Sequence, residues 1–142
     1  MPRTAFIDHI GIGVPDLAAA KRYYDELMPV LGLRQWFETA ADGSFLIGPE
    51  GARGSQLAFY QALEPDTYSR HRTGLQHISF MVSSREIVRE VHEWARARGA
   101  EIVHEPRRFP EYGEHFYATF WLDPHGFMLE AVSYAEEAEP SR

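Results

Sequence analysis

The sequence repeats itself, and this repeat constrains the fold more than any other feature. His9-Ile10 in the first half corresponds to His77-Ile78, which follows 68 residues later. A glycine at the predicted end of a helix recurs at nearly the same spacing, as Gly32 and Gly99. Internal repeats of this size indicate that one structural unit has been duplicated. We therefore expect two similar halves, which must pack together or associate to bury the sheet face that each exposes.

The first half has the pattern of a strand, a helix and three further strands. Residues 6–14 alternate in hydropathy as a strand does, and Asp16 is a typical helix N-cap. The predicted helix covers residues 17–31, with Pro29 expected to end or kink it early and Gly32 to cap its C-terminus. The three predicted strands that follow are at 33–38, 44–47 and 56–62.

The second half follows the same order. Residues 74–82 form the predicted strand, and Ser83 with Glu86 forms a capping box for a helix that runs to Gly99. A tight turn is predicted at Asp123-Pro124-His125-Gly126, between the last two strands. The predicted strands of this half are at 100–104, 116–122 and 127–133.

The predicted fold class is therefore α+β, built from two tandem βαβββ modules. We assign residues 1–66 to the first module, 67–73 to a polar linker and 74–134 to the second module. The polar residues 135–142 are expected to form a flexible tail. A chain of 142 residues has the size of one compact domain, so we expect the two modules to form one.

The composition excludes several classes of protein. The chain has no cysteine, which excludes disulfides, thiolate metal sites and cysteine nucleophiles. Its net charge of −7 disfavours nucleic acid as a partner. No apolar run approaches the roughly 18 residues that a membrane span needs, and the N-terminus lacks a signal-peptide pattern. We therefore expect a cytoplasmic protein that acts on a small molecule, with neither nucleic acid nor membrane as a partner.

Two histidines and one glutamate suit a metal site. His9 and His77 lie opposite most of the apolar side chains of their strands, and Gly11 and Gly13 beside His9 leave room for a ligand. Glu130 stands in an apolar strand, where a carboxylate is costly unless a cation or hydrogen-bond donors satisfy it. Two imidazoles and one carboxylate, each expected in the middle of a strand, are the ligand set of a facial triad. These three residues therefore predict one divalent ion of the Zn, Fe, Ni or Mn class.

Further residues are candidates to line the pocket. Ala58 is the position in the first half that corresponds to Glu130, and it offers no ligand. Gln56 shares the face of Ala58 and is a candidate hydrogen-bonding group or weak ligand. Tyr117 and Trp121 complete this predicted pocket set, although aromatic residues of this kind are more commonly part of the core.

Proton transfer at such a site needs a base. The candidate catalytic residues are Tyr60, His104, Tyr112 and His115. The alternative for these positions is an ordinary loop or a core strand.

Together these motifs resemble those of the vicinal oxygen chelate superfamily, which includes glyoxalase I, bleomycin-resistance proteins and extradiol dioxygenases. The resemblance covers about residues 5–134. In the first half it is carried by Ile7-Asp8-His9-Ile10, Val14-Pro15-Asp16-Leu17, Tyr23-Tyr24 and Leu31-Gly32-Leu33. In the second half it is carried by Gln76-His77-Ile78-Ser79-Phe80, Gly99-Ala100, and Asp123-Pro124-His125-Gly126 leading to Glu130.

The resemblance implies a cupped, partly open eight-stranded sheet around a metal, with the helices outside. His9, His77 and Glu130 match the ligand positions of the superfamily. Ala58 does not, because members similar to glyoxalase I usually have a glutamate there. The remaining His-His-Glu set is similar to that of the extradiol enzymes. The resemblance also implies a homodimer, in which exchanged modules would let the ligands come from two chains.

We therefore expect a divalent-metal-dependent enzyme similar to glyoxalases and dioxygenases. Its substrate would bind the metal through two adjacent oxygens, and the chemistry would be that of a lyase, an isomerase or an extradiol dioxygenase. The alternative is a non-catalytic, antibiotic-type binding protein that sequesters a small molecule. The metal content of the purified protein distinguishes the two.

Overall fold

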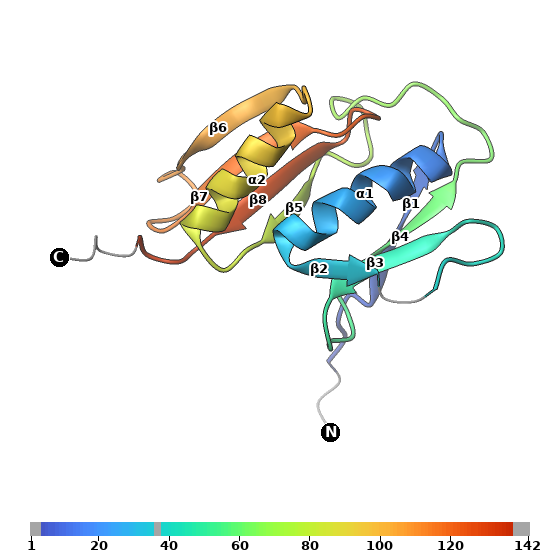
Figure 1. The fold of residues 1–142 in the computed structure, drawn as a ribbon, viewed down its shortest axis with the longest axis horizontal. Helices are drawn as coiled ribbons and strands as arrows, with labels where there is room; N and C mark the ends of the chain where they lie inside the picture. Colours follow the sequence, from blue (N-terminus) through green and yellow to red (C-terminus); the bar gives the residue numbers. More distant parts are fainter. Residues whose placement is uncertain (1–3, 36–37, 138–142) are drawn as a thin grey trace. The chain divides into compact units, whose positions relative to one another are not determined.

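The computed structural model describes residues 4–35 and 38–137, which contain two helices and eight strands. The chain divides into two compact units, the first ending at Thr67 and the second starting at Tyr68 (Figure 1). Each unit has the element order βαβββ and one four-stranded sheet. The predicted α+β class with two repeated modules is therefore confirmed. Neither helix in the described part of the chain has the length and apolar character needed to cross a membrane.

The first unit is one sheet covered by one helix. Its sheet has the strand order β1-β4-β3-β2, in which β1 and β4 are parallel and the other neighbours are antiparallel. Helix α1 packs against this sheet (Figure 1). The elements are β1 (His9–Val14), α1 (Leu17–Leu31), β2 (Leu33–Gln35), β3 (Phe45–Pro49) and β4 (Gln56–Gln61).

Helix α1 has the caps that the sequence predicts. The Asp16 side chain accepts a hydrogen bond from the Ala19 amide at 2.9 Å, and Gly32 ends the helix in the left-handed conformation, with φ of 76°. The expectation that Pro29 ends the helix early is wrong, because α1 continues to Leu31 with Pro29 inside it. Pro29 has no amide hydrogen to donate to the Asp25 carbonyl, so α1 lacks one helical hydrogen bond in its last turn.

The core of the first unit is a group of three aromatic rings between α1 and the sheet. The ring of Phe59 on β4 lies 4.5 Å from that of Tyr24 on α1 and 4.8 Å from that of Phe45 on β3, measured between ring centroids. All three side chains are buried, and Tyr24 and Phe59 have no exposed surface. This packing orders the strand that carries Ala58 and Tyr60.

The second unit repeats this arrangement. Its sheet has the order β5-β8-β7-β6, with β5 and β8 parallel and the other pairs antiparallel. Helix α2 packs against β6, β7 and β8 (Figure 1). The elements are β5 (Ile78–Met81), α2 (Arg85–Ala97), β6 (Ile102–Arg108), β7 (Tyr117–Leu122) and β8 (Met128–Ser133).

The N-cap of α2 is Ser84, and the predicted capping box at Ser83 is wrong. The Ser84 hydroxyl accepts a hydrogen bond from the Ile87 amide at 3.2 Å. The backbone of Val82 is still bonded to Val132 of β8, so the chain has not left the sheet early enough for Ser83 to cap the helix.

Both first strands of the modules are shorter than predicted. β1 starts at His9 and β5 at Ile78, where pairing with the parallel neighbouring strand begins. His9 is therefore the first residue of its strand and His77 lies just before its strand, so the expectation that both lie mid-strand is wrong. Glu130 is inside β8, as predicted.

Two other predicted strands have different limits. The strand predicted at 33–38 is observed at Leu33–Gln35, and residues 36–37 lie outside the described residues. The strand predicted at 100–104 is observed as β6, which extends to Arg108 through irregular pairing with β7. Hydropathy alternation alone does not reveal such irregularities, because they shift the side-chain pattern.

Candidate functional site

A cavity of about 630 Å³ lies in the second unit. Its walls come from the face of the sheet that carries Phe120 and Glu130, from the segment before β5 and from the β6–β7 connection. The lining residues are Arg70, Gln76, His77, Ser79, Val103, His104, Phe109, Tyr112, Phe116, Phe120, Met128, Glu130 and Tyr134.

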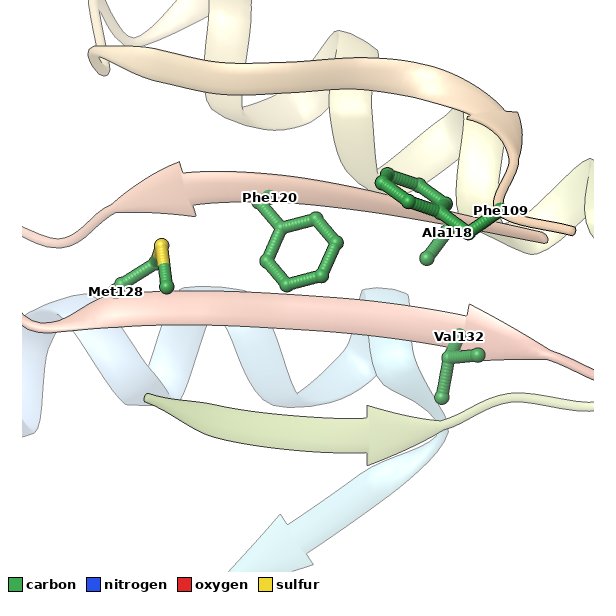
Figure 2. Close-up of a cluster of buried hydrophobic side chains, with 5 residues drawn as sticks. All are labelled: Phe109, Ala118, Phe120, Met128 and Val132. Carbon is green, nitrogen blue, oxygen red and sulfur yellow. The ribbon is translucent and has the colours of Figure 1, made fainter. Parts of the chain in front are cut away.

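The apolar part of this cavity is a packed cluster. Ala118 and Phe120 of β7 project from the same face of the sheet as Met128 and Val132 of β8, and Phe109 lies beside them (Figure 2). These five side chains are buried. Aromatic rings therefore form a firm wall against which a flat or apolar group can pack.

A row of four residues crosses the sheet on the cavity side. Ser79 on β5 is paired with Glu130 on β8, Glu130 with Phe120 on β7, and Phe120 with His104 on β6. Paired residues of neighbouring strands point to the same face of a sheet. The fold thus brings a hydroxyl, a carboxylate, an aromatic ring and an imidazole into one line.

Glu130 is the most unusual member of this row. Its side chain is only 3% exposed, and its Oε2 atom is buried without a hydrogen-bond partner among the described residues. Burial raises the pKa of Glu130 above its ordinary value, while a hydrogen bond from the Ser79 side chain lowers it to a smaller extent. A buried, unsatisfied carboxylate oxygen at a cavity wall is suited to bind a cation or a hydrogen-bond donor.

Both predicted histidine ligands are held by the residue that precedes them. The Asp8 carboxylate lies 2.6 Å from Nδ1 of His9, and Oε1 of Gln76 is bonded to Nδ1 of His77. An oxygen partner assigns the proton to Nδ1 and leaves the lone pair on Nε2. Metal-binding histidines have the same second interaction, which orients the ring and fixes its tautomer.

His104 reaches the cavity because β6 is irregular. Its pairing with β7 shifts on both sides of His104, and the hydroxyl of Thr119 donates a 2.9 Å hydrogen bond to the His104 carbonyl at this place. The imidazole packs edge-on against Phe109 and Phe120, at 5.5 and 5.4 Å between ring centroids. The ring of His77 lies 6.0 Å from Phe120, so Phe120 neighbours both imidazoles.

The first unit confirms which residue corresponds to Glu130. Gly11 on β1 is paired with Ala58 on β4, just as Ser79 is paired with Glu130. The Tyr60 ring lies 3.4 Å from the position that a Cβ on Gly11 would occupy, which is an ordinary packing distance. A hollow of about 210 Å³ remains in this unit, with Ala58 and Tyr60 among its lining residues.

The other residue predicted in the first unit has a structural role. Gln56 is 3% exposed, and its amide group accepts a hydrogen bond from the Gly54 amide and donates one to the Ala52 carbonyl. Both ends of the amide thus hold the loop before β4.

Three residues predicted for the site lie outside the cavity wall of the second unit. Tyr117 stacks under the guanidinium groups of Arg85 and Arg89 of α2, at 5.0 and 5.6 Å. Trp121 shares the face of Tyr117 and has no exposed surface. His115 is not part of the wall either, whereas His104 and Tyr112 are.

The structure brings two of the three predicted metal ligands to one cavity. His77 and Glu130 both line it, and the unpartnered Oε2 atom of Glu130 fits a cation. His9 belongs to the first unit. Across residues 4–35 and 38–137, no three histidine, aspartate or glutamate side chains are grouped closely enough to hold a metal ion. The three-ligand set therefore stays a prediction.

Sequence reasoning missed several lining residues. Ser79 follows His77 by two residues and has the same strand face, so alternation could have identified it. Phe109 and Phe116 flank the β6–β7 connection and have no periodic signal. Arg70 lies in the segment predicted to be a linker.

Comparisons with known proteins agree on one family. The sequence model of the family described as the Glyoxalase/Bleomycin resistance protein/Dioxygenase superfamily matches residues 6–131. The uncharacterized protein YqjT of Bacillus subtilis (strain 168) is 28% identical over 128 residues, which cover 88% of this chain and 96% of YqjT.

Solved structures show the same fold. A candidate glyoxalase from Bacillus halodurans is 29% identical, with a TM-score of 0.72 over 89% of this chain and 94% of its own. A glyoxalase/bleomycin resistance protein from Albidiferax ferrireducens T118 is 22% identical, with a TM-score of 0.69 over 89% of this chain and 98% of its own.

Proposed function

Because this chain belongs to the Glyoxalase/Bleomycin resistance protein/Dioxygenase superfamily, we propose that it is a metal-dependent enzyme acting on a small molecule. The substrate binds in the cavity of the second unit. The observation that carries this proposal is Glu130, a buried carboxylate with an oxygen that has no partner among the described residues, in a cavity that also contains His77. A cation would satisfy this oxygen and offset the cost of burying the charge.

His77 and Glu130 would hold a divalent ion, with His9 as the third donor. A bound ion of this kind supplies Lewis-acid chemistry toward adjacent substrate oxygens. Asp8 and Gln76 keep the two imidazoles in the tautomer that offers Nε2. Glu130 contributes the negative charge and thereby reduces the net charge of the site.

His104 is the residue that we assign to proton transfer. Its ring lines the cavity, it shares the cross-strand row with Glu130, and Phe120 lies between the two in that row. A ring nitrogen of His104 can accept a substrate proton and return it. Tyr112 is the second candidate in the cavity wall, whereas Tyr60 belongs to the first unit.

The aromatic wall also favours a second candidate function. A non-catalytic protein that sequesters a small molecule would use the same rings of Phe109, Phe116 and Phe120. Such a protein would bind its ligand without a metal, and this difference makes the two functions separable.

Elemental analysis of protein purified without added metal tests the proposal. We expect about one divalent ion per chain in the wild type, and loss of the ion in His77→Ala and Glu130→Gln. His115→Ala is the matched control, since this partly exposed histidine lies outside the cavity wall. Stoichiometric metal in both cavity variants would refute the assignment, and a metal-free wild type that binds small molecules would favour the second function.

A further inference from the structure

Arg70 lies in the wall of the same cavity, although it belongs to no helix or strand. It is half-buried and lies in the segment that leads into β5. Among the described residues that line the cavity, Arg70 is the single lysine or arginine, and Glu130 is the single carboxylate.

The segment that carries Arg70 is closed on itself and attached to the second unit. The Tyr68 hydroxyl donates a 2.5 Å hydrogen bond to the Leu75 carbonyl, which joins the two ends of the segment. The Tyr68 ring packs edge-on against Phe127, at 4.6 Å between centroids. A turn within the segment is held by the bond from the Arg72 amide to the Ser69 carbonyl. These contacts place Arg70 at the cavity through a defined loop.

The Arg70 guanidinium has no hydrogen bond and no ion pair with any residue that the structure describes. Glu130 lines the same cavity and forms no ion pair with Arg70. Other arginines of this unit are paired with acidic side chains: Arg85 and Arg89 with Glu137, Arg96 with Glu93, and Arg107 with Glu111. A half-buried guanidinium with free donors is suited to bind a carboxylate or phosphoryl group in a bidentate manner.

We infer that Arg70 binds an anionic group of the substrate, a carboxylate or a phosphoryl group, while the aromatic wall holds the apolar body of the same molecule. This inference rests on the proposed function, because it takes the cavity of the second unit as the substrate site. It further specifies that the substrate carries a negative charge. Glu130 is the one carboxylate among the described lining residues, and a divalent cation bound to it would leave a net positive charge that adds to that of Arg70. The cavity then selects an anion.

Binding of simple aromatic probes to the full chain tests this inference. Benzoate and phenylphosphonate carry the anionic group, and benzamide is a neutral molecule of similar shape. Affinities are measured by ligand-observed NMR in the presence of a chelator and are repeated with Glu130→Gln as the parent protein, so that neither a metal nor the Glu130 carboxylate contributes. We expect at least one of the two anions to bind the wild type about tenfold more tightly than benzamide, as charge-assisted hydrogen bonds do.

Two variants and one control locate the effect. Arg70→Gln should remove the preference for the anion while keeping benzamide binding, and Arg70→Lys should keep part of it, because lysine retains the charge but not the bidentate geometry. Arg72→Gln is the matched control, since it removes an equal charge from an exposed position of the same loop. Circular dichroism checks that each variant is folded. If Arg70→Gln does not fold, Arg70→Lys provides the test.

The inference is overturned if neither anion binds the wild type more tightly than benzamide, if Arg70→Gln keeps the preference, or if Arg72→Gln loses it equally. A protein that prefers the anion but contains no metal retains this inference and loses the metal-dependent function. A protein that contains metal but shows no such preference retains the metal-dependent function and loses this inference. The tighter of the two anions identifies the class of the anionic group.

Discussion

Glu130 lies directly across from Ser79 on the neighbouring parallel strand, and its Oε2 atom is buried without a partner in the described part of the chain. The same pair of positions in the first unit holds Ala58 and Gly11, with the ring of Tyr60 packed over the glycine. The duplicated modules therefore have the same strand register but differ in their side chains. One module has a charged cavity wall at these positions, and the other has small residues with an aromatic ring beside them.

The pH dependence of stability tests the state of Glu130. Burial raises its pKa above the ordinary value of 4.5, so the folded protein holds this proton at pH values where the unfolded chain has lost it. The cost of the buried charge is absent below the unfolded pKa and grows as the pH rises through the folded pKa. In metal-free protein, Glu130→Gln should therefore have a larger free energy of unfolding than the wild type at about pH 7, and the difference should vanish near about pH 4.

Urea denaturation at the two pH values, with a chelator present, measures this difference. Glu105→Gln is a suitable control, because this exposed residue of β6 should show no such change with pH. An equal effect of Glu130→Gln at both pH values would contradict the raised pKa.

The residues before the two histidines offer a second test. Asp8→Ala and Gln76→Ala remove the oxygen that holds Nδ1 of His9 and His77. Each substitution is expected to weaken metal binding about tenfold, because the imidazole loses its fixed tautomer and orientation. Competition with a chromophoric chelator measures the affinity, and the exposed Asp66→Ala serves as the control. Unchanged affinity in both variants would mean that these side chains do not position the ligands.

Metal binding should also weaken as the pH falls. A protonated imidazole has no free lone pair, so protons compete with the metal at His9 and His77. The same competition titration over a pH series measures this effect. Affinity that does not change across the range in which histidine titrates would exclude imidazole ligands.

The hydroxyl of Thr119 supports the irregular part of β6. Thr119→Val keeps the shape of this fully buried side chain but removes the donor to the His104 carbonyl, at a cost of about 1 kcal/mol. Thr119→Ser retains the hydroxyl and should keep this bond. The position of the His104 ring, followed by its NMR chemical shifts, should change in the valine variant only. Equal shifts in both variants would mean that the Thr119 hydroxyl does not set the position of the His104 ring.

The aromatic core of the first unit sets its stability. Phe59→Ala removes a ring that packs on both Tyr24 and Phe45, and we expect a loss of about 3–5 kcal/mol in the free energy of unfolding. Phe6→Ala is the control, since Phe6 is 86% exposed and should change stability by less than about 0.5 kcal/mol. A loss below about 1 kcal/mol at Phe59 would show that the first unit does not depend on this cluster.

The sequence by itself determined the order of elements and the duplication. Alternating hydropathy, the Asp16 cap and the glycine at position 32 act within a few residues, so they can be interpreted without a structure. The correspondence of Ala58 with Glu130 followed from the repeat, and the strand register confirms it. The buried position of Glu130 was predictable because its neighbours along the chain are apolar, and burying them also buries the carboxylate.

Only the tertiary structure decided where strands begin and which side chains meet. β1 and β5 start where a parallel partner becomes available, and this partner comes from the far end of each module. Arg70 reaches the cavity through the contact of Tyr68 with Phe127, and His104 reaches it through an irregularity next to Thr119. These placements depend on contacts between residues distant in the chain, and local hydropathy and turn signals contain no information about such contacts.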